Sequence, residues 1–179
     1  MVTTSTLKEK LCGSEYDAAL ARIYKPEDIA AQKQRYIRVA EAFEDLFGSG
    51  RQVGVFSAPG NHTDHNHGKV LAAGVNLDAV AVASKNDEGI VRVKSEGYDM
   101  DVVDLGDLGV MPNERGRSVS LVRGVCAAFK NRGYQVGGFD AATASDVLSG
   151  SGLSSSAAFE VLLGTMLNYL YNDGKVSAV

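Results

Sequence analysis

A run of glycine and serine residues before a helix-like apolar repeat constrains the fold of this chain more than any other feature. The segment Asp146–Val161 reads DVLSGSGLSSSAAFEV, and its glycines permit turns in which a Cβ would clash. At the start of the following helix the backbone N–H groups have no helical partner, and they lie at the positive end of the helix dipole. These donors, with the hydroxyls of Ser151, Ser154, Ser155 and Ser156, favour a phosphate-binding loop in which one hydroxyl can face Mg²⁺.

The common phosphate-binding fingerprints do not account for this loop. No Lys-Ser or Lys-Thr pair follows it, as a Walker A motif requires, and Ser155 stands where a dinucleotide-binding pattern has its third glycine. A serine-rich helix N-cap is the simpler alternative, because serine is a preferred capping residue. One serine is enough for a cap, however, so three in a row favour the anion-binding interpretation. The helix that follows has apolar residues at helical spacing: Phe159, Leu162, Leu163, Met166, Leu167 and Leu170.

Helical and strand-like patterns are mixed along the rest of the chain. Apolar residues at intervals of three and four predict helices over residues 26–47 and 119–132, each followed by a glycine. Strand-like runs cover residues 52–57, 78–84, 90–95, 99–105 and 139–147. We expect the second and third of these runs to form a hairpin across residues 85–89. This order of elements favours an α+β sandwich over a doubly wound parallel sheet.

Composition and charge argue against several classes of function. The chain has 179 residues, of which 45% are hydrophobic, and a formal net charge of −4 without a clustered run of lysine and arginine. Nucleic acid and anionic membranes are therefore not expected as partners. Cys12 and Cys126 form no Cys-x-x-Cys pair, and no segment has the character of a membrane span or a signal peptide. We expect a cytoplasmic protein.

Three segments resemble the galactokinase branch of the GHMP small-molecule kinases. Gly150–Val161, GSGLSSSAAFEV, is similar to the second signature of that family. Ser120–Val147 resembles the galactokinase segment that leads into this loop, and Phe56–Leu77, FSAPGNHTDHNHGKVLAAGVNL, resembles the galactokinase sugar-binding signature. The resemblance implies the amino-terminal domain of the GHMP fold, which is similar to the second domain of ribosomal protein S5. Residues 51–179 would form this domain, and helices within residues 1–50 would lead into it.

The resemblance also implies an activity and a set of binding residues. The activity is transfer of the ATP γ-phosphoryl group to the anomeric hydroxyl of galactose, by a monomer that uses Mg²⁺. Asn61, His62 and Asp64 would bind the sugar, and amide, imidazole and carboxylate groups suit the hydroxyls of a polyol. Ser156 would face the metal ion. The ATP site would comprise Ser149, Gly150, Ser151, Gly152, Leu153, Ser154, Ser155 and Ser156.

The polar segment at residues 61–67, NHTDHNH, permits other interpretations from its residues alone. It contains every histidine of the chain, and imidazole and carboxylate groups at close spacing can bind zinc. Zinc sites usually take their ligands from separate elements or from one helix face, and a short loop after Pro59-Gly60 offers neither. A solvated polar turn is a further alternative.

Two departures from the family pattern bear on activity. Galactokinases have a Pro-Gly-Arg sequence and a short connector before a Glu-His-Thr-Asp-Tyr segment, whereas here Pro59-Gly60 joins directly to Asn61-His62-Thr63-Asp64-His65. The arginine, which in the family lies at the reacting centre, is absent, and Arg51 does not occupy its position. The changes of the first and last residues of the sugar segment keep hydrogen-bonding capacity and bear on sugar preference.

The family also continues well beyond the position of Val179, where its catalytic aspartate, a magnesium-binding carboxylate and a second domain are found. We therefore expect a truncated, inactive polypeptide to which no catalytic residue can be assigned. Asp140 and Asp146 lie in or at the end of the last predicted strand, where pairing or capping is expected rather than catalysis. A non-catalytic sensor of galactose and ATP and a purely structural fragment are the alternative functions.

Overall fold

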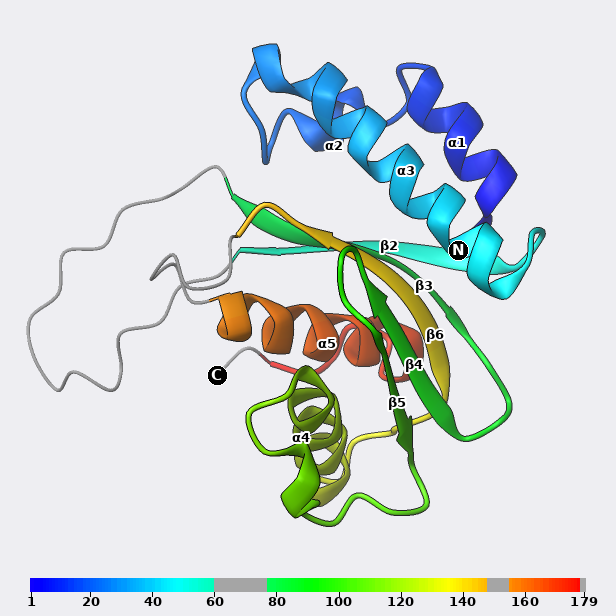
Figure 1. Ribbon diagram of the computed structural model, residues 1–179. Helices are drawn as coiled ribbons and strands as arrows, with labels where there is room; N and C mark the ends of the chain where they lie inside the picture. Colours follow the sequence, from blue (N-terminus) through cyan, green and yellow to red (C-terminus); the bar gives the residue numbers. More distant parts are fainter. Residues whose placement is uncertain (60–76, 148–154, 178–179) are drawn as a thin grey trace, which may run out of the picture.

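Figure 1 shows the computed structural model of the chain, in which the described residues are 1–59, 77–147 and 155–177. Within these residues a six-stranded sheet has the strand order β1-β2-β3-β6-β4-β5. Helices α1, α2 and α3 cover one face of the sheet, and α4 and α5 cover the other (Figure 1). This layered arrangement of helices on a mixed sheet confirms the predicted α+β class.

The structure contains each helix and strand that the sequence predicted, and it adds short elements near the amino terminus. The helices are α1 (Thr4–Cys12), α2 (Asp17–Leu20), α3 (Ile29–Phe47), α4 (Ser118–Asn131) and α5 (Ser155–Tyr171), with 3-10 turns η1 (Pro26–Asp28) and η3 (Pro112–Glu114). The strands are β1 (Val2–Thr3), β2 (Gln52–Pro59), β3 (Asp78–Lys85), β4 (Ile90–Ser95), β5 (Met100–Asp104) and β6 (Phe139–Ser145).

Helix α3 is the main element above the sheet, and its ends follow from the local sequence. Pro26 starts the preceding 3-10 turn, where its fixed φ angle is suited to a first helical position. Gly48 ends the helix with a φ of 88°, and its amide donates to the carbonyl of Glu44 over 2.9 Å. The apolar face of α3 is buried and includes Tyr36, Val39, Ala40 and Phe43.

The central strands β3 and β6 are buried on both faces of the sheet. Alternate side chains of each strand therefore enter two different hydrophobic cores, one on each face. The alternating alanines of β3 pack towards α4 and α5, whereas Val80 and Val82 pack towards α1 and α3. Strand β6 divides in the same way, with Phe139 and Ala141 on the first side. This alternation is the period-two pattern of a strand, applied to a sheet that has helices on both faces.

The predicted hairpin between residues 78–84 and 90–95 is wrong, because β6 lies between the two strands. Strand β6 is antiparallel to β3 and parallel to β4. The amide of Asn86 donates to the carbonyl of Gly138 over 2.8 Å, and its side-chain nitrogen donates to the carbonyl of Ile90 over 3.0 Å. A Cβ on Gly138 would lie 2.2 Å from the side-chain oxygen of Asn86. The connection after β3 therefore bonds to the beginning of β6 and holds β3 and β4 one strand apart.

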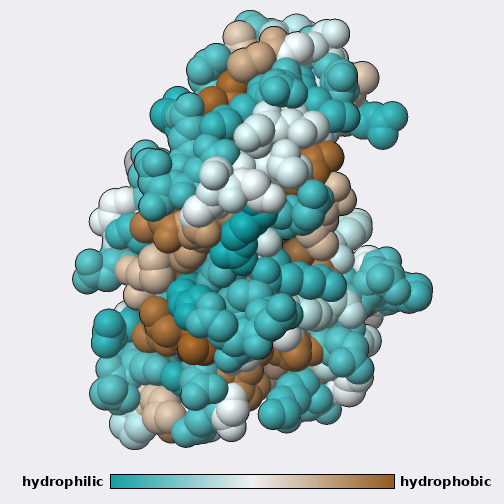
Figure 2. Space-filling view, turned by 90° about the vertical axis from the view of Figure 1, so that its right-hand side faces the viewer, coloured by the Kyte–Doolittle hydropathy of each residue, from teal (hydrophilic) through white to brown (hydrophobic). Residues whose placement is uncertain are grey.

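Helix α5 contributes several large, fully buried side chains beneath the sheet. Leu162, Leu163, Met166 and Leu167 are each at most 1% exposed, and the helix packs against β2, β3 and α4. Among the described residues, no helix is both long enough and apolar enough to cross a membrane. Figure 2 shows one side of the molecule, where hydrophilic residues cover most of the surface and apolar patches are separate.

Candidate functional site

The structure describes only part of the predicted binding set. Ser155 and Ser156 form the first residues of α5, where Ser155 is half-buried and Ser156 is exposed. The predicted sugar residues Asn61, His62 and Asp64 lie outside the described residues. The other ATP-site residues, Ser149, Gly150, Ser151, Gly152, Leu153 and Ser154, also lie outside them.

The residues that flank both predicted binding segments lie at one end of the sheet. Pro59 precedes the sugar segment, and it is paired with Asp78 at the beginning of β3. Ser145 ends β6 and is paired with Ala79, so it lies beside the same strand end. The amide of Asp146 then donates to the carbonyl of Asp78 over 3.0 Å. The flanks of residues 60–76 and the residues before 148 are therefore hydrogen-bonded neighbours.

Helix α5 begins near the same end of the sheet (Figure 1). It has 17 residues, and its first turn contains no acidic side chain. The amide groups of this turn carry the partial positive charge of a long helix, which an acidic residue would otherwise neutralise. The exposed hydroxyl of Ser156 adds a polar group at this position. The start of α5 thus has the positive partial charge that favours anions, and a serine hydroxyl oxygen is of the type that Mg²⁺ accepts as a ligand.

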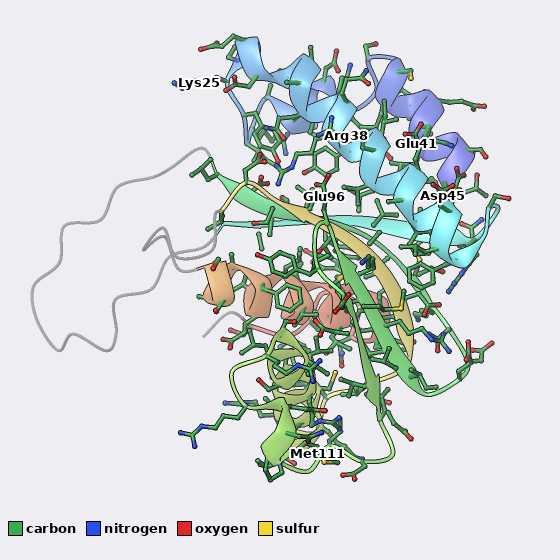
Figure 3. The ribbon with its side chains drawn as sticks, in the orientation of Figure 1. Lys25, Arg38, Glu41, Asp45, Glu96 and Met111 are labelled. Carbon is green, nitrogen blue, oxygen red and sulfur yellow. The ribbon has the colours of Figure 1, made fainter. Side chains whose placement is uncertain are left out.

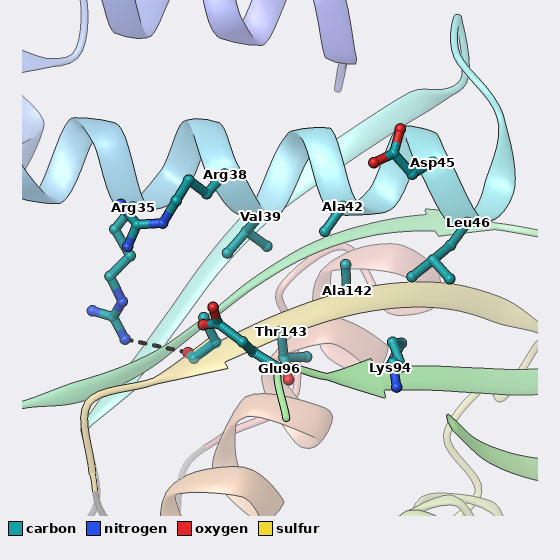
Figure 4. Close-up of a pocket in the computed structure, with 11 residues that line it drawn as sticks. Arg35, Arg38, Val39, Ala42, Asp45, Leu46, Lys94, Glu96, Ala142 and Thr143 are labelled. Carbon is teal, nitrogen blue, oxygen red and sulfur yellow. Dashed lines mark hydrogen bonds between the residues drawn. The ribbon is translucent and has the colours of Figure 1, made fainter. Parts of the chain in front are cut away.

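A buried arginine of helix α3, Arg35, contacts both the beginning of β3 and the end of β6. Arg35 of α3 donates through Nη1 to Oδ1 of Asp78 over 2.7 Å, and the same nitrogen lies 2.9 Å from Oδ2 of Asp146. Its Nη2 donates to the carbonyls of Asp78 and Ala144 over 2.8 and 3.2 Å. Figure 4 shows the bond from Arg35 to the carbonyl of Ala144 as a dashed line. One guanidinium therefore contacts both β3 and β6.

Two tyrosines complete the environment of Asp78. Tyr24 donates to Oδ2 of Asp78 over 2.6 Å, and the hydroxyls of Tyr24 and Tyr36 are 3.1 Å apart. Burial raises the pKa of Tyr24 well above its usual value, and the hydrogen bond to Asp78 raises it further. Both carboxylate oxygens of Asp78 are therefore occupied, one by Arg35 and the other by a phenol that stays protonated.

The opposite end of the sheet holds a second ionic cluster around Asp140. This residue is 2% exposed, and it contacts Arg51 over 2.7 Å and Arg92 over 3.1 Å. The side chain of Asn86 also donates to it, over 3.1 Å. Asp140 and Asp146 are both paired with arginine, as the sequence analysis expected of residues at these strand positions. Asp140 also lies at the start of β6, away from the predicted loop.

A cavity of about 260 Å³ lies between α3 and the strands β4 and β6. Arg38 and Asp45 from α3 and Lys94 and Glu96 from the β4 side line it, with Val39 and Leu46 among its apolar residues (Figure 4). Figure 3 shows Arg38 and Asp45 on α3 and Glu96 below that helix. Of the predicted binding residues that the structure describes, neither Ser155 nor Ser156 lines this cavity. Its lining does include Arg35 and Ala144, so the cavity adjoins the end of β6.

The zinc interpretation of the histidine segment is not tested, because that segment lies outside the described residues. Within residues 1–59, 77–147 and 155–177, no group of three or more histidine, cysteine, aspartate and glutamate side chains could hold a metal ion. Cys126 is buried, which raises the pKa of its thiol to about 12, and Cys12 is a free cysteine at the surface.

Two family models match the chain. The galactokinase galactose-binding signature matches residues 41–85, and the GHMP kinases N terminal domain matches residues 120–178. The first match contains Asn61–Asp64, and the second contains the glycine- and serine-rich loop with α5. In both matched segments the chain is similar to the galactokinase branch of the GHMP kinases.

Known galactokinases are similar to this chain over part of their length. A galactokinase of Streptomyces coelicolor is 39% identical over 142 residues, which cover 76% of this chain and 36% of that protein. The crystal structure of Lactococcus lactis galactokinase complexed with galactose has 30% sequence identity and a TM-score of 0.65, and the match covers 74% of this chain and 36% of that one. The chain thus spans little more than a third of either galactokinase. The structural likeness confirms the predicted GHMP-type domain.

Arg35 is the residue of the site that the sequence analysis missed. It lies four residues before Val39 and is 4% exposed, on the same face as the apolar residues of α3. Residues four apart lie on one face of a helix, so a charged residue at this spacing was the available signal for a buried ionic contact.

Proposed function

We propose that this chain supplies the ATP- and galactose-binding part of a galactokinase-type site. The observation that carries the proposal is the hydrogen-bonded contact between Asp78 and Asp146. It brings Asp78, which lies within the matched galactose-binding signature, next to the residues that lead into the matched GHMP loop. A phosphoryl donor and its acceptor must be held close together and in line, so neighbouring strand ends are a suitable base for both segments.

Each segment has a distinct role in this proposal. The amides at the start of α5, with the preceding residues Ser149–Ser154, would hold the ATP phosphates, and Ser156 would face Mg²⁺. The ion would neutralise charge on the β- and γ-phosphates. Asn61, His62 and Asp64 would orient galactose so that its anomeric hydroxyl faces the γ-phosphoryl group. Binding of galactose by the Lactococcus lactis relative supports this choice of sugar.

We further propose that this chain alone binds its ligands without turning them over. The sequence places no arginine between Gly60 and Asn61, so the fixed cation that would offset charge at the reacting centre is missing. At this end of the sheet Asp78 and Asp146 are both paired with Arg35. Both carboxylates are engaged by this guanidinium, so neither is placed as a free general base for the sugar hydroxyl.

Calorimetry and an ADP-release assay test these statements separately. We expect titrations to show binding of Mg²⁺-ATP and of galactose, with glucose as the matched control sugar. A coupled assay with both ligands should then show no ADP release above the rate without galactose. Robust galactose-dependent turnover would contradict the role given to the absent arginine. Failure to bind either ligand would contradict the proposed function as a whole and would favour a purely structural fragment.

A non-catalytic sensor of galactose and ATP is the second candidate, and the absent arginine favours it as well. The two candidates differ in the effect of restoring that residue. Inserting an arginine and a short connector between Gly60 and Asn61 should create turnover if the absent arginine is what separates this protein from a working kinase. Ligand binding without turnover, both before and after the insertion, would support the sensor.

A further inference from the structure

We propose that the cavity between α3 and the strands β4 and β6 binds a free α-amino acid with an apolar side chain. The cavity has a volume of about 260 Å³. Ligand pockets usually have about 300–1,000 Å³, so this one suits a small molecule and is too small for a nucleotide. The proposal goes beyond the proposed function and does not depend on it, because the residues that line the cavity lie outside both predicted binding segments.

Contacts near the two ends of α3 show how this helix is aligned over the sheet. Arg35, in the first half of α3, donates to the carbonyl of Ala144 near the end of β6. Arg51, which follows α3, contacts the side chain of Asp140 near the beginning of β6. Early residues of α3 therefore lie over the end of β6, and later ones lie over its beginning.

Each end of the cavity has one cation and one anion, which come from opposite walls. On β4, Lys94 is paired with Ala142, and Glu96 comes two residues later, towards the end of β6. On α3, Arg38 and Asp45 are seven residues apart, which corresponds to about 10 Å along a helix axis. Arg38 and Glu96 thus line the end of the cavity near the end of β6, and Asp45 and Lys94 line the other (Figure 4).

The two charges at the first end are available to a ligand. Within the described part of the chain, the side chains of Arg38 and Glu96 have no hydrogen bond and no ion pair, with each other or with another residue, and both residues are exposed. The neighbouring Arg35 differs, because Asp78 and Asp146 already pair with its guanidinium. A compound that carries both charges can accept from Arg38 and donate to Glu96 through charge-assisted hydrogen bonds.

Apolar side chains line the cavity between its charged ends. Val39 and Ala42 come from α3, and Ala142 comes from β6. Leu46, next to Asp45 at the second end, is 42% exposed although it is a large apolar residue. An apolar group that extends from the first end along this surface would remove it from water, which favours binding.

A free α-amino acid combines these properties. Its carboxylate suits the guanidinium of Arg38, because the planar donors of arginine match the two oxygens of a carboxylate. Its ammonium group suits the carboxylate of Glu96. Its side chain leaves the same carbon atom and can cover Val39 and approach Leu46. A simple carboxylate or a simple amine would use only one of the two charged groups.

Titration of the chain with L-leucine, followed by amide NMR shifts, tests the proposal. We expect saturable shifts for residues that line the cavity, such as Thr143 and Ala144. Arg38→Gln and Glu96→Gln should each weaken binding about tenfold, as the loss of one charge-assisted contact implies. The compounds 4-methylpentanoate and 3-methylbutylamine, which each lack one charged group of leucine, should bind about tenfold more weakly as well. Absence of saturable binding by the wild-type chain would overturn the proposal, and so would an unchanged affinity in both variants.

Two further variants separate binding in the cavity from a general effect of surface charge. Glu41→Gln is the matched control, because Glu41 is an exposed residue of α3 that does not line the cavity. It should keep the wild-type affinity, and a loss as large as that in Glu96→Gln would contradict the proposal. Ala42→Phe places a large side chain in the cavity at an exposed helix position and should abolish binding without removing a charge. Thermal unfolding should show that all variants are folded, and wild-type affinity in folded Ala42→Phe would exclude this cavity as the binding site.

Discussion

Tyr24 donates its hydroxyl hydrogen to Oδ2 of Asp78 over 2.6 Å, and both residues are buried. Burial raises the pKa of Tyr24, and it also raises the pKa of Tyr36. A phenol whose pKa is higher in the folded than in the unfolded protein stabilises the fold fully below the unfolded pKa of about 10. That contribution is lost as the pH rises from there towards the folded-state pKa.

The first prediction concerns this loss of stability at high pH. The free energy of unfolding should decrease as the pH rises above about 10, and less steeply in Tyr24→Phe than in the wild type. At pH 7 the variant should be less stable by about 1–3 kcal/mol, because Asp78 loses a buried donor. Urea unfolding between pH 7 and 11 measures both effects. Tyr98→Phe, at a position that is 59% exposed, is the control, and equal slopes for Tyr24→Phe and the wild type would contradict the prediction.

A second prediction concerns the core beneath the sheet. Leu162 of α5 is 0% exposed, so Leu162→Ala should reduce the free energy of unfolding by about 2–5 kcal/mol through lost burial and a residual cavity. The adjacent Val161 is 52% exposed, and Val161→Ala should change stability by less than about 1 kcal/mol. Denaturant unfolding of both variants checks the difference. Similar losses would mean that α5 is not oriented as described.

The third prediction is that alanine substitutions at two glycines change the stability of the protein in opposite directions. A Cβ on Gly138 would lie 2.9 Å from the carbonyl oxygen of Ile90, a backbone atom that cannot easily move, so Gly138→Ala should cost about 1–3 kcal/mol. Gly124 lies within α4, and a Cβ there would meet nothing within 4 Å. Gly124→Ala should therefore stabilise the protein by about 0.5–1 kcal/mol. Thermal and urea unfolding measure whether each substitution stabilises or destabilises the protein. A stabilising effect of Gly138→Ala would contradict the close approach of Gly138 to the Ile90 carbonyl.

The fourth prediction addresses the start of α5. If Ser156 faces Mg²⁺, Ser156→Ala should weaken Mg²⁺-dependent ATP binding about tenfold, which corresponds to the loss of one charge-assisted contact. Thr165→Ala on the same helix is the control, because the hydroxyl of Thr165 donates to the carbonyl of Val161 over 2.8 Å, two turns or more from the helix start. Calorimetry with and without Mg²⁺ measures the effect. An unchanged affinity of Ser156→Ala would remove this residue from the proposed metal contact.

Local patterns predicted the elements of this fold better than their arrangement. The spacing of Tyr36, Val39 and Phe43 identified α3 because a helix repeats every 3.6 residues and buries one face. The order of strands was not accessible in this way. Periodicity tells which face of a strand is buried, whereas the neighbours of β3 depend on where β6, more than fifty residues later, finds its partners. A short connection after β3 therefore suggested a hairpin that does not exist.

In the candidate site, too, the local features could be predicted from the sequence, whereas the long-range contacts could not. The serines near the start of α5 and the polar segment after Pro59 carry their chemistry in the local sequence, so residue types alone pointed to phosphate and polyol ligands. Arg35 and Asp78 are 43 positions apart, and their contact exists only because α3 crosses the ends of β3 and β6. Only the charged position on the apolar face of α3 signalled that such a partner was needed.

The insertion of β6 between β3 and β4 has a consequence for how this protein is made. Residues 78–85 and 90–95 leave the ribosome before residues 139–145, which must pair with both of them. Until then, β3 and β4 each present an unpaired edge, and unpaired edges of apolar strands invite association with other chains. Closing the sheet thus depends on contacts between distant residues, which slows folding relative to a simple meander. A fragment that ends between Asp104 and Phe139 should consequently aggregate during synthesis, even though it contains five of the six strands.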